Sequence, residues 1–288
     1  MTGGSGTEHA EAAALDHLVL RYSSLGDVVL AASITGALGR VGFATGPAYQ
    51  ELVARFPGVV AVFGPEDTLP AEVPLIDLHH NLRSARVRAS ARVERQDWRR
   101  WAHVWFKGPP ADRVIDRYAR AAGVTPAPAP WLAPVERGDT LLIAPGAAHA
   151  TKRWPYWRAL AAAWPGPVRA LGGPADADRV REIGGVWETG FTKTITAMNG
   201  GAVLVAGDSG LLHLGAAVGL PVVGVFGPTT SADGFWCHRG EVVELPLACR
   251  PCSKYGGPTC PMGDHACMRG ISVEQVLAAC LRVARLPG

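Results

Sequence analysis

Short apolar runs alternate with amphipathic stretches along most of this chain, which predicts a repeated strand–helix plan. The clearest example is VLVAGDSGLLHLGAAVGLPVVGVF at residues 203–226, which we interpret as strand, turn, helix, turn and strand. Its apolar runs, 203–206 and 222–226, are typical of strands buried on both faces of a parallel sheet. Between them, leucine and valine recur at helical spacing until Gly219 and Pro221 end the helix.

The same alternation predicts two sets of elements. In the first set we expect strands at 18–22, 41–45, 59–63 and 75–78, and helices at 28–38, 48–56 and 111–122. In the second set we expect strands at 140–144, 168–171, 203–206 and 222–226, and helices from Trp154 onward and at 176–183, 194–199 and 211–218. Alternating β and α elements imply an α/β fold with parallel sheets. Ligands of such sheets bind at the carboxyl ends of the strands, so the polar loops are expected to line one cleft.

Alternating prolines in TPAPAP, residues 125–130, are typical of a semi-rigid spacer. We therefore predict a disordered tail at 1–14, a first domain at 15–124, a linker at 125–134 and a second domain at 135–288. The second domain would include a cysteine-rich loop and a terminal helix. A length of 288 residues suits two domains.

Composition and charge narrow the class of protein. The chain is 48% hydrophobic and 18% charged, so it can bury a large core. A net charge of only +3 argues against a nucleic-acid partner. The tail has no signal-peptide pattern, and the longest apolar region, 211–226, is interrupted by His213, glycines and Pro221. We therefore expect a cytoplasmic protein that at most touches a membrane surface.

Four of the six cysteines cluster near the end of the chain as Cys249-x2-Cys252-x7-Cys260-x6-Cys267. In a cytosolic protein such a cluster is either a metal site or a set of reduced thiols. Four thiolates suit a structural zinc or iron ion, but the second pair lacks C-x2-C spacing. Both interpretations therefore stay open.

The turn Ser209-Gly210-Leu211 opens a predicted helix and could bind an anion. Free N–H groups at a helix start, together with the helix dipole, favour negative charge. Ser209 is also a good N-cap residue, so an ordinary strand–helix turn is the alternative.

Five motifs carry a resemblance to a known family. They are RYSSLGDVVLAAS at 21–33, IDLHHNLRSA at 76–85, PGAAHATKRWP at 145–155, GDSGLLHLGAAVGLPVVGVFGPT at 207–229 and CRPCSKYGGPTCPMGDHACMRGIS at 249–272. In this order they resemble glycosyltransferase family 9, the ADP-heptose:lipopolysaccharide heptosyltransferase family, and its heptosyltransferase II-like members. The resemblance covers about residues 17–280. It implies a GT-B fold of two Rossmann-like domains, with parallel sheets facing across a cleft.

The resemblance also implies an activity. A heptose or related sugar would pass, with inversion and without a catalytic metal or other cofactor, from a nucleotide-diphosphate donor such as ADP-heptose. The acceptor would be a lipopolysaccharide core or another anionic cell-surface glycolipid at the inner face of the inner membrane. A nicotinamide oxidoreductase and a P-loop nucleotidase are disfavoured because their glycine motifs are absent.

Residue roles follow from the resemblance. Asp27 would be the general base, although an aspartate there can also cap a helix. Lys152 would neutralise the leaving diphosphate, although most loop lysines are simply solvated. Asp208 would bind donor-sugar hydroxyls or form a turn through its own side chain. The donor-binding set is Thr151, Asp208, Ser209, Gly210, Leu211 and His213, and the acceptor-binding set is Ser24, Gly26, Asn81 and Arg83.

An arginine-rich stretch follows the second motif, with arginines at 83, 86, 88, 92, 95, 99 and 100. Guanidinium groups bind carboxylates and phosphates, so the stretch suits an anionic acceptor or an anionic membrane surface. A solvated helix face is an equally good interpretation.

Two departures keep other functions open. The first domain is short for the family, and diphosphate loops do not distinguish ADP from UDP or GDP. The alternatives are a glycosyltransferase with another nucleotide-sugar and acceptor, and a non-catalytic sugar- or nucleotide-binding module of the same fold.

Overall fold

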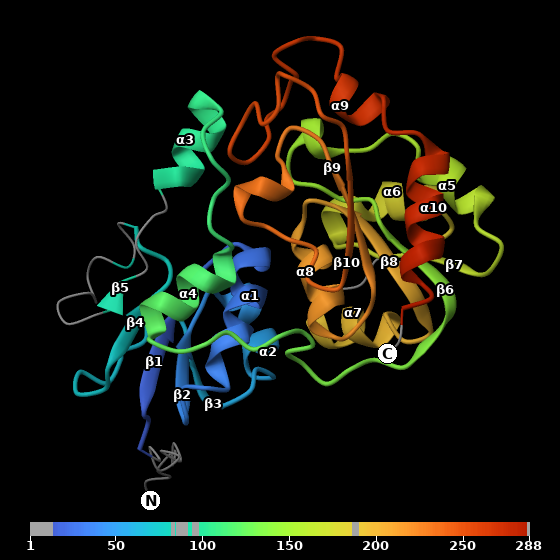
Figure 1. The fold of residues 1–288 in the computed structure, drawn as a ribbon. Helices are drawn as coiled ribbons and strands as arrows, with labels where there is room; N and C mark the ends of the chain where they lie inside the picture. Colours follow the sequence, from blue (N-terminus) through green and yellow to red (C-terminus); the bar gives the residue numbers. More distant parts are fainter. Residues whose placement is uncertain (1–13, 82–83, 85–91, 94–97, 186–189, 287–288) are drawn as a thin grey trace, which may run out of the picture.

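The computed structural model describes residues 14–81, 84, 92–93, 98–185 and 190–286. Its backbone forms two parallel five-stranded sheets with helices packed against them (Figure 1). The α/β fold with two parallel sheets, predicted from the alternation of elements, is therefore confirmed. Residues 1–13 of the predicted tail lie outside the described part of the chain.

The first sheet has the strand order β3-β2-β1-β4-β5. Its strands are β1 (His17–Leu20), β2 (Val41–Ala44), β3 (Val59–Phe63), β4 (Leu75–Asp77) and β5 (Arg92–Val93). The helices of this half are α1 (Leu25–Thr35), α2 (Gln50–Val53), α3 (Trp98–Phe106) and α4 (Val114–Ala122). The strands β1 and β2 are apolar and almost wholly buried, as expected for central parallel strands.

The second sheet has the order β10-β9-β8-β6-β7. Its strands are β6 (Arg137–Ala144), β7 (Val168–Ala170), β8 (Gly201–Gly207), β9 (Val222–Phe226) and β10 (Gly240–Glu244). The helices are α5 (Trp157–Ala163), α6 (Ala177–Glu182), α7 (Phe191–Ala197), α8 (Gly210–Ala217), α9 (Ala266–Arg269) and α10 (Val273–Val283). Every residue of β8 and β9 is buried.

The two halves meet where α1 packs on α8, between the sheets in Figure 1. A Cβ atom on Gly26 would lie 2.9 Å from Cδ2 of His213, and one on Gly210 would lie 2.5 Å from Cγ of Leu25. Such distances are too short for any side chain, so glycine is required for this close approach. Because α1 and α8 each follow the central strand of their sheet, their N-termini lie together at the junction.

The segment 125–134 bonds to both halves. The Ala127 N–H donates to the carbonyl of Ser33 on α1, and the Trp131 N–H donates to the carbonyl of Ala217 on α8. The division into domains at this segment stays a prediction, because a single apolar core includes α1, α8 and β8.

Four elements escaped the sequence patterns: β5 and α3 within the arginine-rich stretch, and β10 and α9 near the end of the chain. Another difference is that α1 begins at Leu25 rather than at residue 28, because Ser24 and Asp27 form a capping box.

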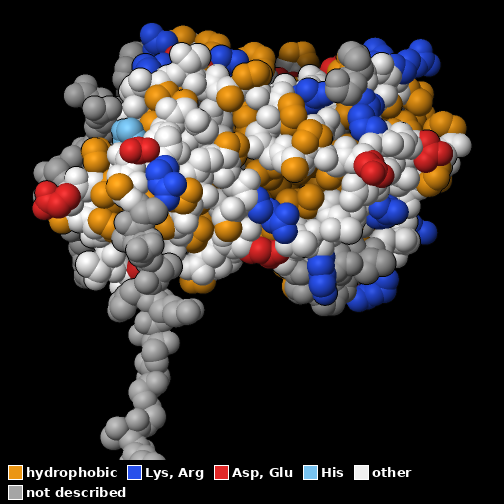
Figure 2. All heavy atoms as spheres, turned by 90° about the horizontal axis from the view of Figure 1, so that it is seen from below, with side chains coloured by type: hydrophobic (Ala, Val, Ile, Leu, Met, Phe, Trp, Pro, Cys, Tyr) orange, Lys and Arg blue, Asp and Glu red, His pale blue; other side chains and the backbone are white. Residues whose placement is uncertain are grey.

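Acidic and basic side chains are interspersed with apolar ones over the face shown in Figure 2. In the described part of the chain, no helix has the length and apolar character needed to cross a bilayer.

Candidate functional site

Two adjoining cavities open at the junction between the halves. The large cavity has a volume of 560 Å³ and the small cavity 370 Å³. They share four lining residues, Leu25, Ala148, Ser209 and Gly210. The loops after β1, β6 and β8 meet here, as the rule on strand carboxyl ends predicts. One elongated ligand could therefore occupy both cavities across the N-terminus of α8.

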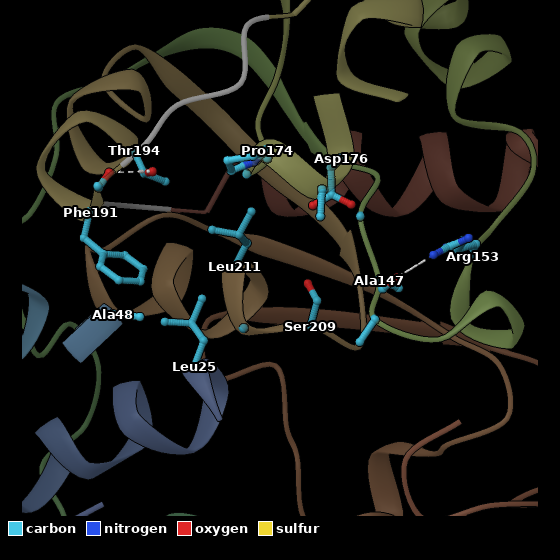
Figure 3. Close-up of a pocket in the computed structure, with 17 residues that line it drawn as sticks. Leu25, Ala48, Ala147, Arg153, Pro174, Asp176, Phe191, Thr194, Ser209 and Leu211 are labelled. Atoms are coloured by element: carbon cyan, nitrogen blue, oxygen red, sulfur yellow. Dashed lines mark hydrogen bonds between the residues drawn. The ribbon is translucent and has the colours of Figure 1, made fainter. Parts of the chain in front are cut away.

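The large cavity has mostly apolar walls (Figure 3). Ser209 and Leu211 of the α8 segment lie between Phe191 on one side and Ala147 on the other, while Leu25 projects from α1 of the first half. The Arg153 side chain is turned toward the carbonyl of Ala147, to which it donates at 3.3 Å. Apolar walls with a few fixed polar groups are typical of a site for a planar ring and its attached sugar.

The small cavity combines charged groups from both halves. Its lining residues are Ser24, Leu25, Gly26, Asp27, Arg100, Ala148, His149, Lys152, Asp208, Ser209, Gly210, His213, Phe235, Lys254 and Tyr255. The structure thus brings together Asp27 and Lys152, which are 125 positions apart in the sequence (152 minus 27). Seven of the other predicted site residues line the same cavity or its neighbour, namely Ser24, Gly26, Asp208, Ser209, Gly210, Leu211 and His213.

Asp27 has three partners at the start of α1. Its Oδ2 forms an ion pair with Arg21 at 2.8 Å and accepts from the Ser24 hydroxyl at 2.8 Å, and its Oδ1 accepts from the Tyr118 hydroxyl at 3.3 Å. Burial alone would raise the pKa of this carboxyl, but Arg21, Ser24 and Arg100 hold it below its ordinary value. Asp27 is therefore ionised at neutral pH. It also makes the capping contact with the Ser24 N–H, at 3.4 Å.

Lys152 and Asp208 form the charged pair on the opposite wall. The Nζ of Lys152 lies 2.7 Å from Oδ2 of Asp208, and the Thr229 hydroxyl donates to the same oxygen at 2.8 Å. Burial would raise the pKa of Asp208, but Lys152 and the Thr229 hydroxyl lower it. An ammonium has three donors, so Lys152 can hold Asp208 and still donate to a ligand.

Ser209 and His213 carry buried polar atoms for which the described residues provide no partner: the hydroxyl oxygen and Nδ1, respectively. Ser209 is the N-cap residue of α8, as predicted, but its side chain makes no capping hydrogen bond. A buried polar atom without a partner costs free energy, so one held at a cavity wall indicates a ligand. Burial lowers the pKa of His213 despite the nearby Asp208 and Asp27, so its ring is neutral.

Thr151 lies beside the site but is fully engaged elsewhere. Its hydroxyl donates to the Gly257 carbonyl at 2.9 Å and accepts from the Gly257 N–H at 2.8 Å, while Nε2 of His265 lies 2.6 Å from the Thr151 carbonyl oxygen. These bonds fasten the cysteine-rich loop over Lys152, whose stem lies under Gly256. The structure thus gives Thr151 a loop-holding position, and its donor contact stays a prediction.

The four clustered cysteines lie in the loop after β10 and at the start of α9. None of the described His, Cys, Asp and Glu residues gather in threes or more as metal ligands would. Cys267 is buried in the second apolar core beside Met268, and burial raises its pKa to about 11. The four thiols are close enough to affect one another: Cys249 and Cys260 add to the raised pKa of Cys252, and all three add to that of Cys267. The cysteines form no disulfide bond, and a structural zinc or iron ion held by these four thiols stays a prediction.

The predicted acceptor residues divide into two groups. Ser24 and Gly26 line the small cavity. Asn81 lies in the turn after β4, where its side chain bonds to His79 and Ser84, and it lines neither cavity. Arg83, with the arginines at 86, 88 and 95, lies outside the described residues.

Within the described part of the arginine-rich stretch, Arg100 reaches the site. It is 8% exposed, and its guanidinium stacks on Phe235 at 4.9 Å and on Tyr255 at 5.4 Å. Its Nη2 donates to the Lys254 carbonyl at 2.9 Å, while its Nε is buried without a partner among the described residues. A positive charge therefore stands beside Asp27 in the small cavity.

Several site residues carried no clear signal in the sequence. Arg21 and Thr229 follow β1 and β9 and could have been found from the rule that strand carboxyl ends carry function. The sequence offers no such rule for Tyr118, Phe235 and Tyr255, because they come from distant segments that meet only in the folded chain.

Two parallel-sheet halves with a shared ligand cavity between them define a GT-B-like fold. The protein-family model described as "Glycosyltransferase family 9 (heptosyltransferase)" matches residues 115–262 of this chain. The chain belongs to glycosyltransferase family 9.

Individual proteins agree with this assignment. Lipooligosaccharide heptosyltransferase 2 of Campylobacter jejuni is 35% identical over 77 residues, which cover 26% of this chain and 23% of that protein. The matched segment thus spans about a quarter of the curated relative. The family 9 glycosyl transferase of Veillonella parvula has a TM-score of 0.71 at 18% identity and covers 93% of this chain and 96% of its own. ADP-heptose lps heptosyltransferase II of E. coli has a TM-score of 0.64 at 17% identity, with coverage of 94% and 98%.

Proposed function

We propose that this protein transfers a heptose or closely related sugar from ADP-heptose to a glycan acceptor of lipopolysaccharide biosynthesis, with inversion at the transferred carbon. Membership of family 9 supports the class of reaction, and the name of the E. coli structure supports the donor and the lipopolysaccharide acceptor. The single observation that carries the proposal is the shared cavity in which Asp27 and Lys152, from opposite halves, face one ligand space.

The donor spans both cavities in this proposal. Its adenosine occupies the large cavity beside Phe191, and its diphosphate crosses the N-terminus of α8 at Ser209 and Gly210. Two features of this helix start support a phosphate there. The hydroxyl of Ser209 is buried without a protein partner, and the first N–H groups of α8 and its dipole favour an anion. The sugar then enters the small cavity.

In the reaction that we propose, the Asp27 carboxylate takes the proton of an acceptor hydroxyl. The oxygen forms its bond to the anomeric carbon as the bond from that carbon to the diphosphate breaks, and ADP leaves with the bonding electrons. Lys152 and the α8 N-terminus stabilise the charge that develops on the diphosphate. Because these groups suffice for the charge balance, we propose that catalysis needs no metal ion.

Asp208 has a supporting position in this scheme. It holds Lys152 at 2.7 Å, and its second carboxylate oxygen is the one available to donor-sugar hydroxyls. Arg100 gives the acceptor side a cation, which supports an anionic glycolipid acceptor. A lipid-anchored acceptor places the enzyme at the cytoplasmic face of the inner membrane.

A donor screen tests the function directly. Thermal unfolding is followed with ADP-heptose, ADP-glucose, UDP-glucose and GDP-mannose, and a lipid-anchored core acceptor is then added and ADP release measured. We expect stabilisation by the ADP-sugars and ADP release with ADP-heptose only. At about a hundredfold excess over Kd, binding adds roughly 2.7 kcal/mol to the free energy of unfolding. Stabilisation by UDP- or GDP-sugars alone would contradict the donor, and binding without any turnover would indicate a non-catalytic module.

A further inference from the structure

Helix α3 exposes three aromatic side chains and buries the guanidinium-bearing Arg100. Trp101, Trp105 and Phe106 are 56%, 61% and 69% exposed, whereas Arg100 is 8% exposed. A surface helix of a globular protein normally has the opposite arrangement, because apolar side chains gain free energy by burial. We call Trp101, Trp105 and Phe106 the aromatic face. In Figure 1, α3 stands at the edge of the molecule, beside the loop between β10 and α9.

The inward side of α3 is fastened by several contacts, so the aromatic face is held outward by the fold. Arg100 donates to the Lys254 carbonyl at 2.9 Å, and His103 bonds to the Gly108 carbonyl at 2.8 Å and to the Thr230 hydroxyl at 3.4 Å. On the outward side, the rings of Trp101 and Phe106 pack edge to face at 5.0 Å. The aromatic groups are therefore ordered against each other while they remain exposed.

The charges around the aromatic face are positive. The segment 98–107, WRRWAHVWFK, contains two arginines, one lysine and no acidic residue. Arg99 and Arg120 both pair with Asp112, at 3.2 Å and 2.7 Å. Lys107 donates to the carbonyls of Cys249 and Pro251, which do not neutralise its charge.

We propose that the aromatic face of α3 inserts into the interfacial layer of an anionic lipid bilayer. Trp and Phe with flanking cations on a short amphipathic helix suit the boundary between headgroups and acyl chains. Three side chains on one helix are far too small a surface for a stable protein interface, which needs roughly 800 Å² per partner. Shallow insertion has no such requirement.

The position of α3 also suits a membrane contact. Arg100 on its inner side lines the small cavity with Asp27, so the same helix would hold the cavity next to the bilayer. This orientation rests on the proposed function, because only a lipid-anchored acceptor has to reach the cavity from a membrane. The binding itself does not depend on any enzymatic activity.

Vesicle binding of the full chain tests the proposal. Wild-type protein is sedimented with vesicles of equal parts phosphatidylglycerol and phosphatidylcholine, and with pure phosphatidylcholine. We expect binding to the anionic vesicles with a blue shift of tryptophan emission, and weaker binding at high salt. The double variant Trp101→Ser/Trp105→Ser should bind the anionic vesicles with an affinity at least about tenfold lower, because two of the three inserting side chains are lost. Val60→Ser is the matched control, since Val60 is 52% exposed on β3, away from α3 in Figure 1, and should bind as wild type.

Two results would overturn the proposal. One is unchanged binding of the double variant with its thermal midpoint and circular dichroism intact. The other is a lipid-free dimer, seen in sedimentation velocity, that dissociates in the double variant, because the aromatic face would then be a contact between copies of this chain. Vesicle binding without sugar transfer would contradict the proposed function but leave this inference standing. Sugar transfer to a water-soluble acceptor without vesicle binding would support the proposed function and contradict this inference.

Discussion

Lys152 and Asp208 form a mostly buried ion pair, with 2.7 Å between Nζ and Oδ2 and both side chains 13% exposed. The pair lines the same small cavity as Asp27 on the α1 segment. Asp208 is thereby kept from facing a donor phosphate as a free anion, while Lys152 is held at a fixed point near the N-terminus of α8. Breaking one member of such a pair leaves the other charge buried and unpaired.

Replacing Lys152 by alanine should therefore impair both catalysis and stability. We expect turnover to fall about 10²–10³-fold, because one charge donor to the leaving group is lost. The free energy of unfolding should drop by about 1–3 kcal/mol, because Asp208 loses its partner. Steady-state kinetics and urea unfolding measure the two effects. The exposed Lys193 on α7 offers the matched Lys193→Ala control, and a Lys152→Ala enzyme with unchanged turnover would remove the residue from the mechanism.

Asp27→Asn separates the base from the binding site. The amide keeps the size of the side chain but cannot take a proton, so turnover should fall by about 10²–10⁴-fold. ADP binding should stay within a few-fold of wild type, since Asp27 does not line the large cavity. Calorimetric titration with ADP and a turnover assay measure the two quantities. The exposed Asp139 supplies a control, Asp139→Asn; loss of ADP affinity together with turnover would mean that Asp27 acts on the donor.

The pH dependence of turnover should reflect Arg21. The pKa of Asp27 lies below its ordinary value of 3.8, so the carboxylate stays ionised as the pH falls from neutral to about 5. The turnover that depends on the Asp27 carboxylate should be lost only when the pH falls through this lowered pKa. Arg21→Gln removes the main attractive charge, so the pKa should rise and the acid limb should move to higher pH. A pH profile of kcat measures this shift, and an unchanged acid limb would show that Arg21 does not control the base.

The sequence predicted most of the fold because the central strands of a parallel sheet are plain in the pattern. The runs 59–63 and 222–226 match β3 and β9 residue for residue. The helix α3 was missed because Trp101, Trp105 and Phe106 face outward while Arg100 faces the cavity, which weakens the amphipathic signal. β10, with only partly buried residues, has no continuous apolar run to detect.

The candidate site was predictable where a residue follows a strand in a recognisable motif, as Asp27 and Ser209 do. The contacts that decide what these residues can do were not predictable from the sequence, because Tyr118, Arg100 and Tyr255 reach the site from distant segments. The cysteine spacing could not decide between a metal site and free thiols, for a related reason. Spacing indicates which thiols are near each other in the chain, whereas a metal site needs their sulfur atoms to converge in space.

Ser209→Ala distinguishes a ligand contact from a helix cap. The hydroxyl makes no capping bond, so its removal should leave the thermal midpoint of the free protein unchanged or slightly raised. ADP affinity should fall about tenfold, the loss of one good hydrogen bond to a charged group. Thermal unfolding with and without ADP measures both. A capping role predicts instead a loss of about 1 kcal/mol in the free protein and no change in affinity. Ser272→Ala is the control, since Ser272 does cap α10 by accepting from the Gln275 N–H at 3.3 Å.

Glu51→Ala tests whether a contact between the halves shapes the large cavity. Glu51 on α2 accepts from the backbone N–H groups of Phe191 at 3.0 Å and Thr192 at 2.8 Å, so a side chain of the first half caps α7 of the second. The Thr192 hydroxyl bond, with the two backbone bonds, lowers the pKa of Glu51, so the cap is present at neutral pH and is lost as the pH falls through that pKa.

Without the carboxylate, the start of α7 loses its acceptor and Phe191 its fixed place at the cavity wall. We expect ADP to bind several-fold more weakly, with kcat at saturating donor unchanged, because Glu51 contacts neither Asp27 nor Lys152. The free energy of unfolding should fall by only about 1 kcal/mol, the usual worth of a helix cap. Titration calorimetry and steady-state kinetics separate affinity from kcat. The exposed Glu72 gives the control Glu72→Ala, and a Glu51→Ala protein with wild-type ADP affinity would show that the cavity keeps its shape without this contact.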